Sequence, residues 1–191
     1  MLKLNNIYKK FKNNIVLKDI NLEFNEGDLV LIKGINGCGK TTLLKIIAGL
    51  IEVTSGSVEM NQKYDIGALI ENPSFIEGKS LKYNLQFLYN LKNKYDEDSV
   101  LSLCEGFSLD LNNNEPMKNY SLGMRQKSGV IQAFMENQNL ILLDEPTRGM
   151  DQESVVFFEA LVNESIKEGK IVIIATHDYE CKLAYNKIVN L

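Results

Sequence analysis

The chain has 191 residues, of which 45% are hydrophobic, and its formal net charge is −4. This length corresponds to one domain with room for a small insertion, and the composition allows a sizeable core. The acidic balance gives no basic field for nucleic acid or acidic lipid, so no nucleic-acid partner is expected. Cys38, Cys104 and Cys181 are widely spaced and form neither a disulfide framework nor a CxxC metal pair, which suits a reducing cytosol.

The first residues lack the apolar run of a signal peptide, and no stretch of about 18 apolar residues is long enough to span a bilayer. We therefore expect a soluble chain. If it works at a membrane, another polypeptide must supply the membrane-spanning part.

The first 50 residues contain two kinds of strand pattern. Apolar and polar residues alternate over 4–8 and 16–24, as expected of half-exposed antiparallel strands. The run 29–32 is continuously apolar, which favours a strand buried on both faces, and a helical segment follows at about 40–50. We therefore predict an N-terminal antiparallel β portion that leads into an α/β body.

The segment 72–136 has a different pattern. Residues with helical spacing recur along it, and they are Leu81, Leu85, Phe87, Leu88, Leu91, Val100, Leu101 and Cys104. We interpret this segment as a helical subdomain inserted into the α/β core, which then comprises residues 1–71 and 137–191.

Helices and strands alternate again towards the end of the chain. Helical segments at 122–137 and 152–167 alternate with the apolar runs 140–143 and 171–175, and Asp-Glu-Pro after the first run would end any helix there. The chain stops at Leu191, in what we expect to be a strand. This alternation predicts an α/β fold with a mainly parallel sheet and crossover helices.

Polar residues follow each of the three apolar runs, at 34–37, 144–146 and 176–178. In open α/β sheets, ligands bind beyond the carboxyl ends of the strands. We therefore expect these residues to gather at one edge of the sheet.

Residues 34–41 fit the phosphate-binding pattern G-x-x-x-x-G-K-[ST] between a strand and a helix. The residues expected to bind the phosphates are Gly34, Ile35, Asn36, Gly37, Cys38, Gly39, Lys40, Thr41 and Thr42. The glycines let backbone N–H groups curl round phosphates, and the following helix adds its N-terminal dipole. Lys40 is expected to reach the β- and γ-phosphates, and the Thr41 hydroxyl to ligate Mg²⁺.

Asp144 and Glu145 follow the apolar run 140–143. The first carboxylate can hold Mg²⁺ through water, and the second can orient or deprotonate an attacking water. A solvated strand end that turns at Pro146 is the alternative, and the nearby phosphate loop favours the functional interpretation.

Three weaker signals each have a structural alternative. His177, the only histidine, follows a buried strand and can contact a γ-phosphate or serve only the structure. Ser121 can cap a helix, and with Gly123 it can also bind an anion at the helix N-terminus. Asp151 can cap the next helix or communicate between subunits.

The order of these motifs resembles that of ATP-binding cassette (ABC) ATPases over essentially the whole chain. Residues 34–41 resemble the Walker A motif, 121–124 the signature motif, 140–145 the Walker B motif with its catalytic glutamate, and 149–151 the D-loop. His177 resembles the switch histidine, which together with Glu145 and Lys40 gives the expected catalytic residues. Phe11 matches the aromatic residue that stacks on adenine, with Tyr8 as the alternative.

The resemblance implies ATP and Mg²⁺ as cofactors, with Thr41, Glu71 and Asp144 near the metal. It also implies a second cassette, whose site Ser121 and Gly123 of this chain would complete. A separate transmembrane permease would hold the chain on the cytoplasmic face of the cell membrane. ATP hydrolysis by the chain would drive transport through this permease.

The sequence departs from the family pattern at four positions. Leu122 stands where glycine is usual, Met124 and Glu71 where glutamine is usual, and Cys38 where serine is usual. The signature variant and Glu71 resemble the antibiotic- and lantibiotic-export or immunity branch. Since position 38 contributes mainly backbone, cysteine should be tolerated there.

Two other functions compete with a transporter ATPase. A soluble cassette ATPase of DNA repair or translation usually has long coiled coils or two cassettes in one chain, and neither fits here. A P-loop kinase needs lid arginines, yet Arg125 and Arg148 are the only arginines.

Overall fold

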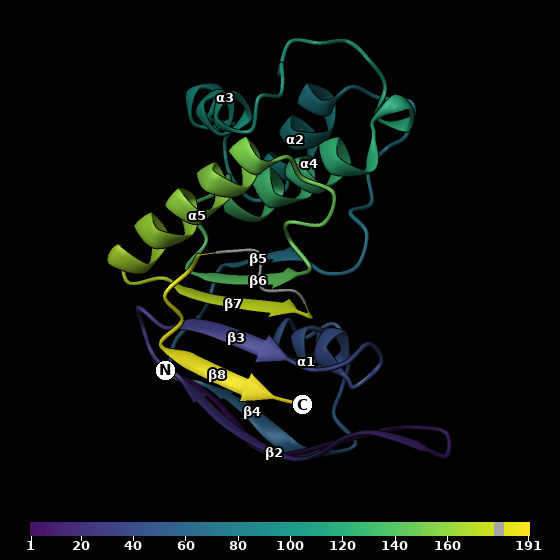
Figure 1. Ribbon diagram of the computed structural model, residues 1–191, viewed down its shortest axis with the longest axis vertical. Helices are drawn as coiled ribbons and strands as arrows, with labels where there is room; N and C mark the ends of the chain where they lie inside the picture. Colours follow the sequence, from purple (N-terminus) through teal and green to yellow (C-terminus); the bar gives the residue numbers. More distant parts are fainter. Residues whose placement is uncertain (178–181) are drawn as a thin grey trace.

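The computed structural model describes residues 1–177 and 182–191 (Figure 1). The strands in these ranges are β1 Leu2–Phe11, β2 Asn14–Phe24, β3 Leu29–Lys33, β4 Ser55–Met60, β5 Ile66–Leu69, β6 Leu140–Asp144, β7 Ile171–Thr176 and β8 Lys187–Asn190. The helices are α1 Lys40–Ile47, α2 Leu81–Tyr89, α3 Glu97–Gly106, the 3₁₀ turn η1 Met117–Asn119, α4 Leu122–Phe134 and α5 Gln152–Lys167.

The described strands form two sheets. One has the order β2-β1-β4 and is antiparallel, and the other has the order β5-β6-β7-β3-β8 and is parallel throughout. The predicted α/β fold, with its parallel sheet and N-terminal antiparallel portion, is therefore confirmed. Sequence reasoning did not predict β4 and β5.

Two helices end earlier than predicted because the chain turns into a left-handed conformation. After α1, Gly49 has φ +70°, and the N–H groups of Gly49 and Leu50 donate back to the carbonyls of Ile46 and Lys45. This is the Schellman pattern that closes a helix. After α4, Asn137 has φ +57°, so the helix cannot continue.

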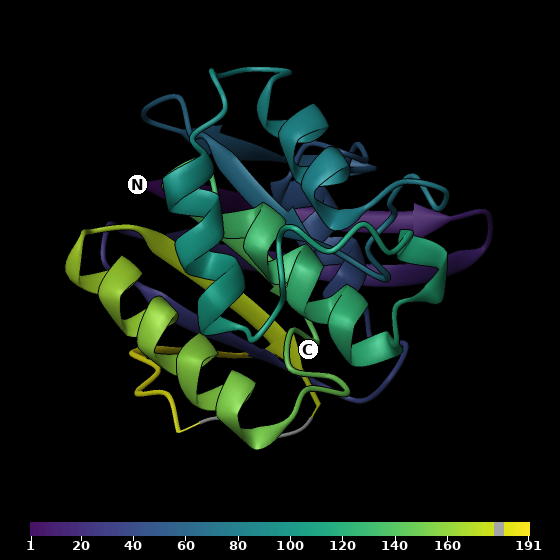
Figure 2. The same ribbon diagram turned by 90° about the horizontal axis from the view of Figure 1, so that it is seen from above.

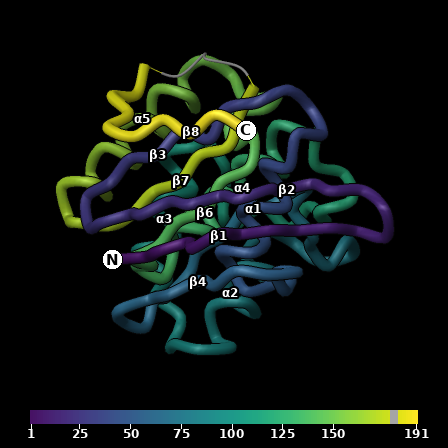
Figure 3. Tube along the Cα trace, turned by 90° about the horizontal axis from the view of Figure 1, so that it is seen from below, coloured from purple at the N-terminus to yellow at the C-terminus, as the bar shows by residue number. Residues whose placement is uncertain are grey.

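The parallel sheet is buried on both faces. Alternate residues of its central strands, such as Leu140 and Leu142, face one core that includes α1 and the three-stranded sheet. The residues between them, such as Ile141 and Leu143, face a second core with the other helices. Figure 1 shows α1 between the two sheets, Figure 3 shows the sheet β2-β1-β4 from below, and Figure 2 shows α3, α4 and α5 covering the opposite face.

Helix α4 lies directly on the edge strand β5. Gly67 approaches α4 so closely that an ideal Cβ would lie 1.8 Å from the carbonyl oxygen of Ala133. The last helix of the predicted inserted subdomain therefore packs on the sheet itself. The division of the chain at 72–136 stays a prediction.

The carboxyl ends of β3, β5, β6 and β7 meet at one edge of the sheet (Figure 1). The phosphate loop follows β3, Asp144 ends β6 and His177 follows β7, so these three gather at one edge as predicted. Glu71 comes to the same edge after β5, a strand that was not predicted. Within residues 1–177 and 182–191, no helix has the length and apolar character needed to cross a membrane.

Candidate functional site

The loop between β3 and α1 is shaped by its glycines. Gly37 and Gly39 have φ +85° and +112°, where L side chains are strained. An ideal Cβ on Gly39 would also lie 2.9 Å from Leu17 Cδ2 and 3.1 Å from the carbonyl oxygen of Val16. Only glycine therefore lets α1 begin at Lys40 so close to β2.

The Lys40 ammonium lies over this loop. Its Nζ donates to the carbonyl oxygens of Gly34, at 2.7 Å, and Ile35, at 3.3 Å. Lys40 is buried. The structure thus places a cation inside a curl of backbone, an arrangement suited to an anionic ligand.

Asp144 and Thr41 are in contact across the sheet edge. The Thr41 hydroxyl donates to Asp144 Oδ2 at 2.5 Å, although the residues are 103 positions apart. Burial raises the pKa of Asp144, whereas the bonds from Thr41 and from the backbone N–H of Glu71 oppose that shift. Two hard oxygen ligands therefore face each other, which fits Mg²⁺.

Glu145 has a left-handed backbone with φ +47° and a tightly held carboxylate. Its N–H donates to the carbonyl oxygen of Ala175 at 2.8 Å. Thr176 Oγ1 donates to Glu145 Oε2 at 2.8 Å, and the N–H of His177 donates to Oε1 at 3.1 Å. His177 Nδ1 also lies 2.6 Å from Oε1. The structure thus brings the predicted glutamate and histidine together.

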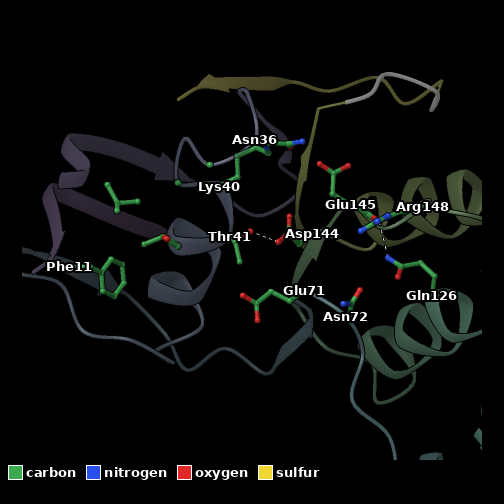
Figure 4. A pocket seen from close by; sticks show the side chains of 14 residues that line it. Phe11, Asn36, Lys40, Thr41, Glu71, Asn72, Gln126, Asp144, Glu145 and Arg148 are labelled. Atoms are coloured by element: carbon green, nitrogen blue, oxygen red, sulfur yellow. Dashed lines mark hydrogen bonds between the residues drawn. The ribbon is translucent and has the colours of Figure 1, made fainter. Parts of the chain in front are cut away.

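Lys40, Thr41, Asp144 and Glu145 line a cavity of about 510 Å³ (Figure 4), whereas His177 is not among its lining residues. Its lining residues are Phe11, Val16, Asn36, Gly37, Gly39, Lys40, Thr41, Thr42, Glu71, Asn72, Gln126, Asp144, Glu145 and Arg148. Phe11 lies at one end and Glu145 at the other, whereas Tyr8 is not among the described lining residues. Asn72, Gln126 and Arg148 were not predicted as site residues.

Glu71 lines the cavity, but its carboxylate has a partner. Lys45 Nζ, from the last turn of α1, lies 2.7 Å from Glu71 Oε1. Glu71 itself has φ +64°. The pair places a positive charge beside the carboxylate that stands where the family usually has an amide.

Ser121 and Gly123 lie outside the cavity of their own chain. Ser121 caps α4 by accepting a bond from the N–H of Met124 at 3.2 Å. Gly123 packs so closely on the next loop that an ideal Cβ would lie 2.2 Å from the carbonyl oxygen of Gly149. The helix-cap interpretation of Ser121 is confirmed, and its role in anion binding stays a prediction.

Asp151 caps α5, as its structural interpretation predicted. Its Oδ1 accepts a bond from the N–H of Ser154 at 2.9 Å, and its Oδ2 lies 2.5 Å from Nζ of the buried Lys127. These contacts hold the pKa of Asp151 well below its usual range, with the Lys127 contact as the largest cause. Asp151 therefore stays charged at neutral pH.

The cysteines in the described ranges are not bonded to each other. Cys38 is part of the phosphate loop and partly exposed, whereas Cys104 is fully buried in the helical region. Burial raises the pKa of Cys104 to about 12. Cys181 lies outside the described residues.

Comparisons with a family model and with known proteins all point to the same family. The ABC transporter family model matches residues 17–148. YybJ of Bacillus subtilis, an ABC transporter ATP-binding protein, is 31% identical over 94% of this chain and 87% of its own length. YdbJ of the same organism is 34% identical over 93% of this chain, which spans only 61% of YdbJ. The lantibiotic transport ATP-binding protein SrtF of Streptococcus pyogenes is 29% identical over 93% of this chain and 80% of SrtF.

Solved structures agree with this result. The dimeric structure of MJ0796, a bacterial ABC transporter cassette, is 25% identical and has a TM-score of 0.83 over 93% of this chain and 88% of that chain. A dimeric post-hydrolysis state of MJ0796 bound to ADP and Pi has a TM-score of 0.80, with the same identity and the same coverage. From the matched family model, the relatives and the shared fold, this chain belongs to the ABC transporter family and is an ATP-binding cassette ATPase.

Proposed function

We propose that this chain is the motor subunit of a transporter, in which Mg²⁺-dependent ATP hydrolysis by two facing cassettes drives a separate membrane-embedded permease. The observation that carries this proposal is the shared cavity. The phosphate loop with Thr41, and the adjacent carboxylates Asp144 and Glu145 from a distant part of the sequence, line one cavity of about 510 Å³.

ATP would lie along this cavity from Phe11 to Glu145. Phe11 is 46% exposed at one end, with Lys9 Nζ 4.7 Å from the centroid of its ring, and this ring would stack on adenine, as any π-face can. The backbone N–H groups of residues 34–42 would bind the phosphates. Lys40, whose Nζ now bonds to backbone carbonyls of the loop, would turn its donors to the β- and γ-phosphate oxygens.

Mg²⁺ would be held by Thr41 and Asp144, with Glu71 nearby. When bound, the metal neutralises charge on the phosphates. Asp144 must be ionised for this role, and its burial opposes ionisation, so the cation and Lys40 would restore the charged form. The carboxylate of Glu71 would remain paired with Lys45, and this pairing limits the negative charge that Glu71 adds near the metal.

Glu145 would orient and polarise the attacking water. Donors from Thr176 and His177 fix its carboxylate, so little reorganisation is needed when the reaction begins. His177 would hold the γ-phosphate end of the nucleotide. Catalysis here is positioning and charge stabilisation, as in other phosphoryl transfers.

Ser121 and Gly123 would complete the site of the facing cassette. They lie outside the cavity of their own chain, at the N-terminus of a 13-residue helix whose dipole favours an anion. The similar cassette MJ0796 is dimeric in its solved structures. ATP bound between two such chains would hold them together until hydrolysis.

The transported substrate is proposed to be a peptide or antibiotic that the permease exports, with the chain attached to the inner face of the cell membrane. The similarity to SrtF supports this proposal, as do the variant signature residues Leu122 and Met124 and the carboxylate of Glu71. The soluble alternative in DNA repair or translation has no comparable support among the relatives reported above.

The test is turnover by Glu145→Gln beside Glu153→Gln, a control that changes an exposed glutamate in the first turn of α5. We expect Glu145→Gln to bind ATP and dimerise but release almost no phosphate, and Glu153→Gln to match the wild type. Phosphate should appear without an organic acceptor, which separates an ATPase from a kinase. Full turnover by Glu145→Gln would remove Glu145 from its role.

Purification from the native membrane tests the transporter itself. A multi-spanning membrane protein should accompany the chain. Recovery of the chain with nucleic acid or ribosomes, and without a membrane protein, would contradict the proposal.

A further inference from the structure

We propose that Gln126 is a positioning residue, which holds the backbone of Glu145 and so couples the N-terminal turns of α4 to the catalytic carboxylate of the same chain. This inference rests on the proposed function of Glu145. Nothing in the local sequence pattern singled out Gln126.

The contact itself is short and shielded. Gln126 is 3% exposed, and its Nε2 donates to the carbonyl oxygen of Glu145 at 2.8 Å (Figure 4). A buried amide is costly without a partner, so this bond has a strong preference to form. The side chain that makes it also lines the ATP cavity.

The backbone of Glu145 needs such support. Its φ of +47° is uncommon for a residue with a side chain, and such conformations persist only where the surroundings over-determine them. The N–H of Glu145 is fixed by Ala175 in β7, and its carbonyl oxygen by Gln126 and by the N–H of Arg148 at 3.2 Å. Of these three, only Gln126 reaches the residue from α4. Without it, the peptide plane after Glu145 is held by its own turn alone, and the carboxylate loses part of its orientation.

The same helix contacts the loop 145–151 at two further points. Gly123 packs on the carbonyl oxygen of Gly149, and Lys127 pairs with Asp151. Helix α4 therefore contacts this loop at three positions, which are residues 145, 149 and 151. An anion bound at Ser121 and Gly123, at the N-terminus of α4, would favour one conformation of this loop. Through Gln126 it would also favour one orientation of Glu145.

The experiment combines Gln126→Met with Glu145→Gln in a double-mutant cycle on the full chain, measured as phosphate release at saturating Mg-ATP. Methionine keeps the length of the side chain and removes the donor. We expect Gln126→Met to lower kcat about ten-fold or more, because small misplacements of a catalytic group cost this much. The Kd for Mg-ATP should change less than about two-fold. In the Glu145→Gln background, Gln126→Met should cause no further loss.

Ser128→Ala is the matched control. Ser128 is fully buried on the same helix, and its hydroxyl donates to the carbonyl of Met124 within α4. Its kcat should stay close to that of the wild type. If Gln126→Met does not fold, Gln126→Leu replaces it, since leucine also lacks the donor.

Two outcomes would overturn the inference. One is a kcat for the donor-less variant within about two-fold of the wild type. The other is the same fold-loss with and without Glu145, which would show a general structural role. Failure of the proposed function looks different, because Glu145→Gln alone would then turn over at the wild-type rate.

Discussion

Gly67→Ala tests the packing that places α4 over the sheet. The added methyl group would lie 1.8 Å from the carbonyl oxygen of Ala133, whereas ordinary contact begins at 3.4 Å. Since both groups belong to backbone, in β5 and in α4, no side chain can turn aside. The helix must therefore move off the strand by about 1.6 Å or the strand must bend.

The cost of this movement follows from the core around α4. Val130, Ile131 and Ala133 are fully buried, so a displaced helix leaves poorly packed atoms behind. Overpacking of this kind costs about 3 kcal/mol at its upper end. Replacing glycine by alanine also lowers the conformational entropy of the unfolded chain, which stabilises the native state by about 1 kcal/mol. A net loss of about 2 kcal/mol lowers Tm by roughly 4–8 °C in a protein of this size.

Thermal unfolding of the nucleotide-free chain, followed by circular dichroism, measures the effect. Gly78→Ala is the matched control, because an ideal Cβ at Gly78 meets nothing within 4 Å and its φ is not positive. Since the same entropy gain of about 1 kcal/mol applies there without a clash, we expect its Tm to lie roughly 2–4 °C above that of the wild type. A Tm of Gly67→Ala within about 1 °C of this control would refute the packing argument.

Three further predictions follow from single contacts. Asp144→Asn should raise the stability of the nucleotide-free chain at neutral pH, because burial raises the pKa of Asp144 and penalises its charge. Since the native state then binds protons more tightly than the unfolded state, this gain should decline as pH falls through the native pKa and be gone below the unfolded pKa, and denaturant titrations at several pH values check it. Asp151→Ala should cost more stability than Asp96→Ala in denaturant titrations: both remove a helix cap of about 1 kcal/mol, and only Asp151 also pairs with a lysine. Equal losses would mean that the ion pair contributes nothing. A thiol reagent should block ATP binding through Cys38 in the phosphate loop and not through the buried Cys104, whose pKa is raised to about 12, so Cys38→Ser should bind ATP normally and resist the reagent. Continued inhibition of that variant would contradict the assignment to Cys38.

The features that sequence reasoning predicted well depend on short segments. The apolar runs that became β3, β6 and β7 are buried on both faces, and α5 spans the predicted 152–167. The phosphate loop was recognisable because its glycines, Lys40 and Thr41 act within eight consecutive residues. Local chemistry determines these elements, so a local pattern reveals them.

The features that were missed depend on distant partners. Strand β4 has the sequence SGSVEM and is mostly exposed, so it lacks a strand pattern and forms by pairing with β1. The four-residue strand β5 is defined by β6 on one side and by α4 against Gly67. Gln126 reaches the carbonyl of Glu145 from 19 residues away, and Lys45 reaches Glu71 from 26 residues away. No local sequence pattern indicates such contacts.

The central claim is that the backbone of the phosphate loop and the Lys40 side chain bind a nucleoside triphosphate, whose Mg²⁺ ion is held by Thr41 and Asp144. Equilibrium binding of ATP to the purified chain, with Mg²⁺ and with excess chelator, tests it most directly. The wild type should bind ATP tightly only with Mg²⁺, and Lys40→Ala should lose binding while keeping its fold by circular dichroism. A wild-type chain with no Mg²⁺-dependent affinity for ATP, or a Lys40→Ala chain that binds ATP as well as the wild type, would contradict the claim.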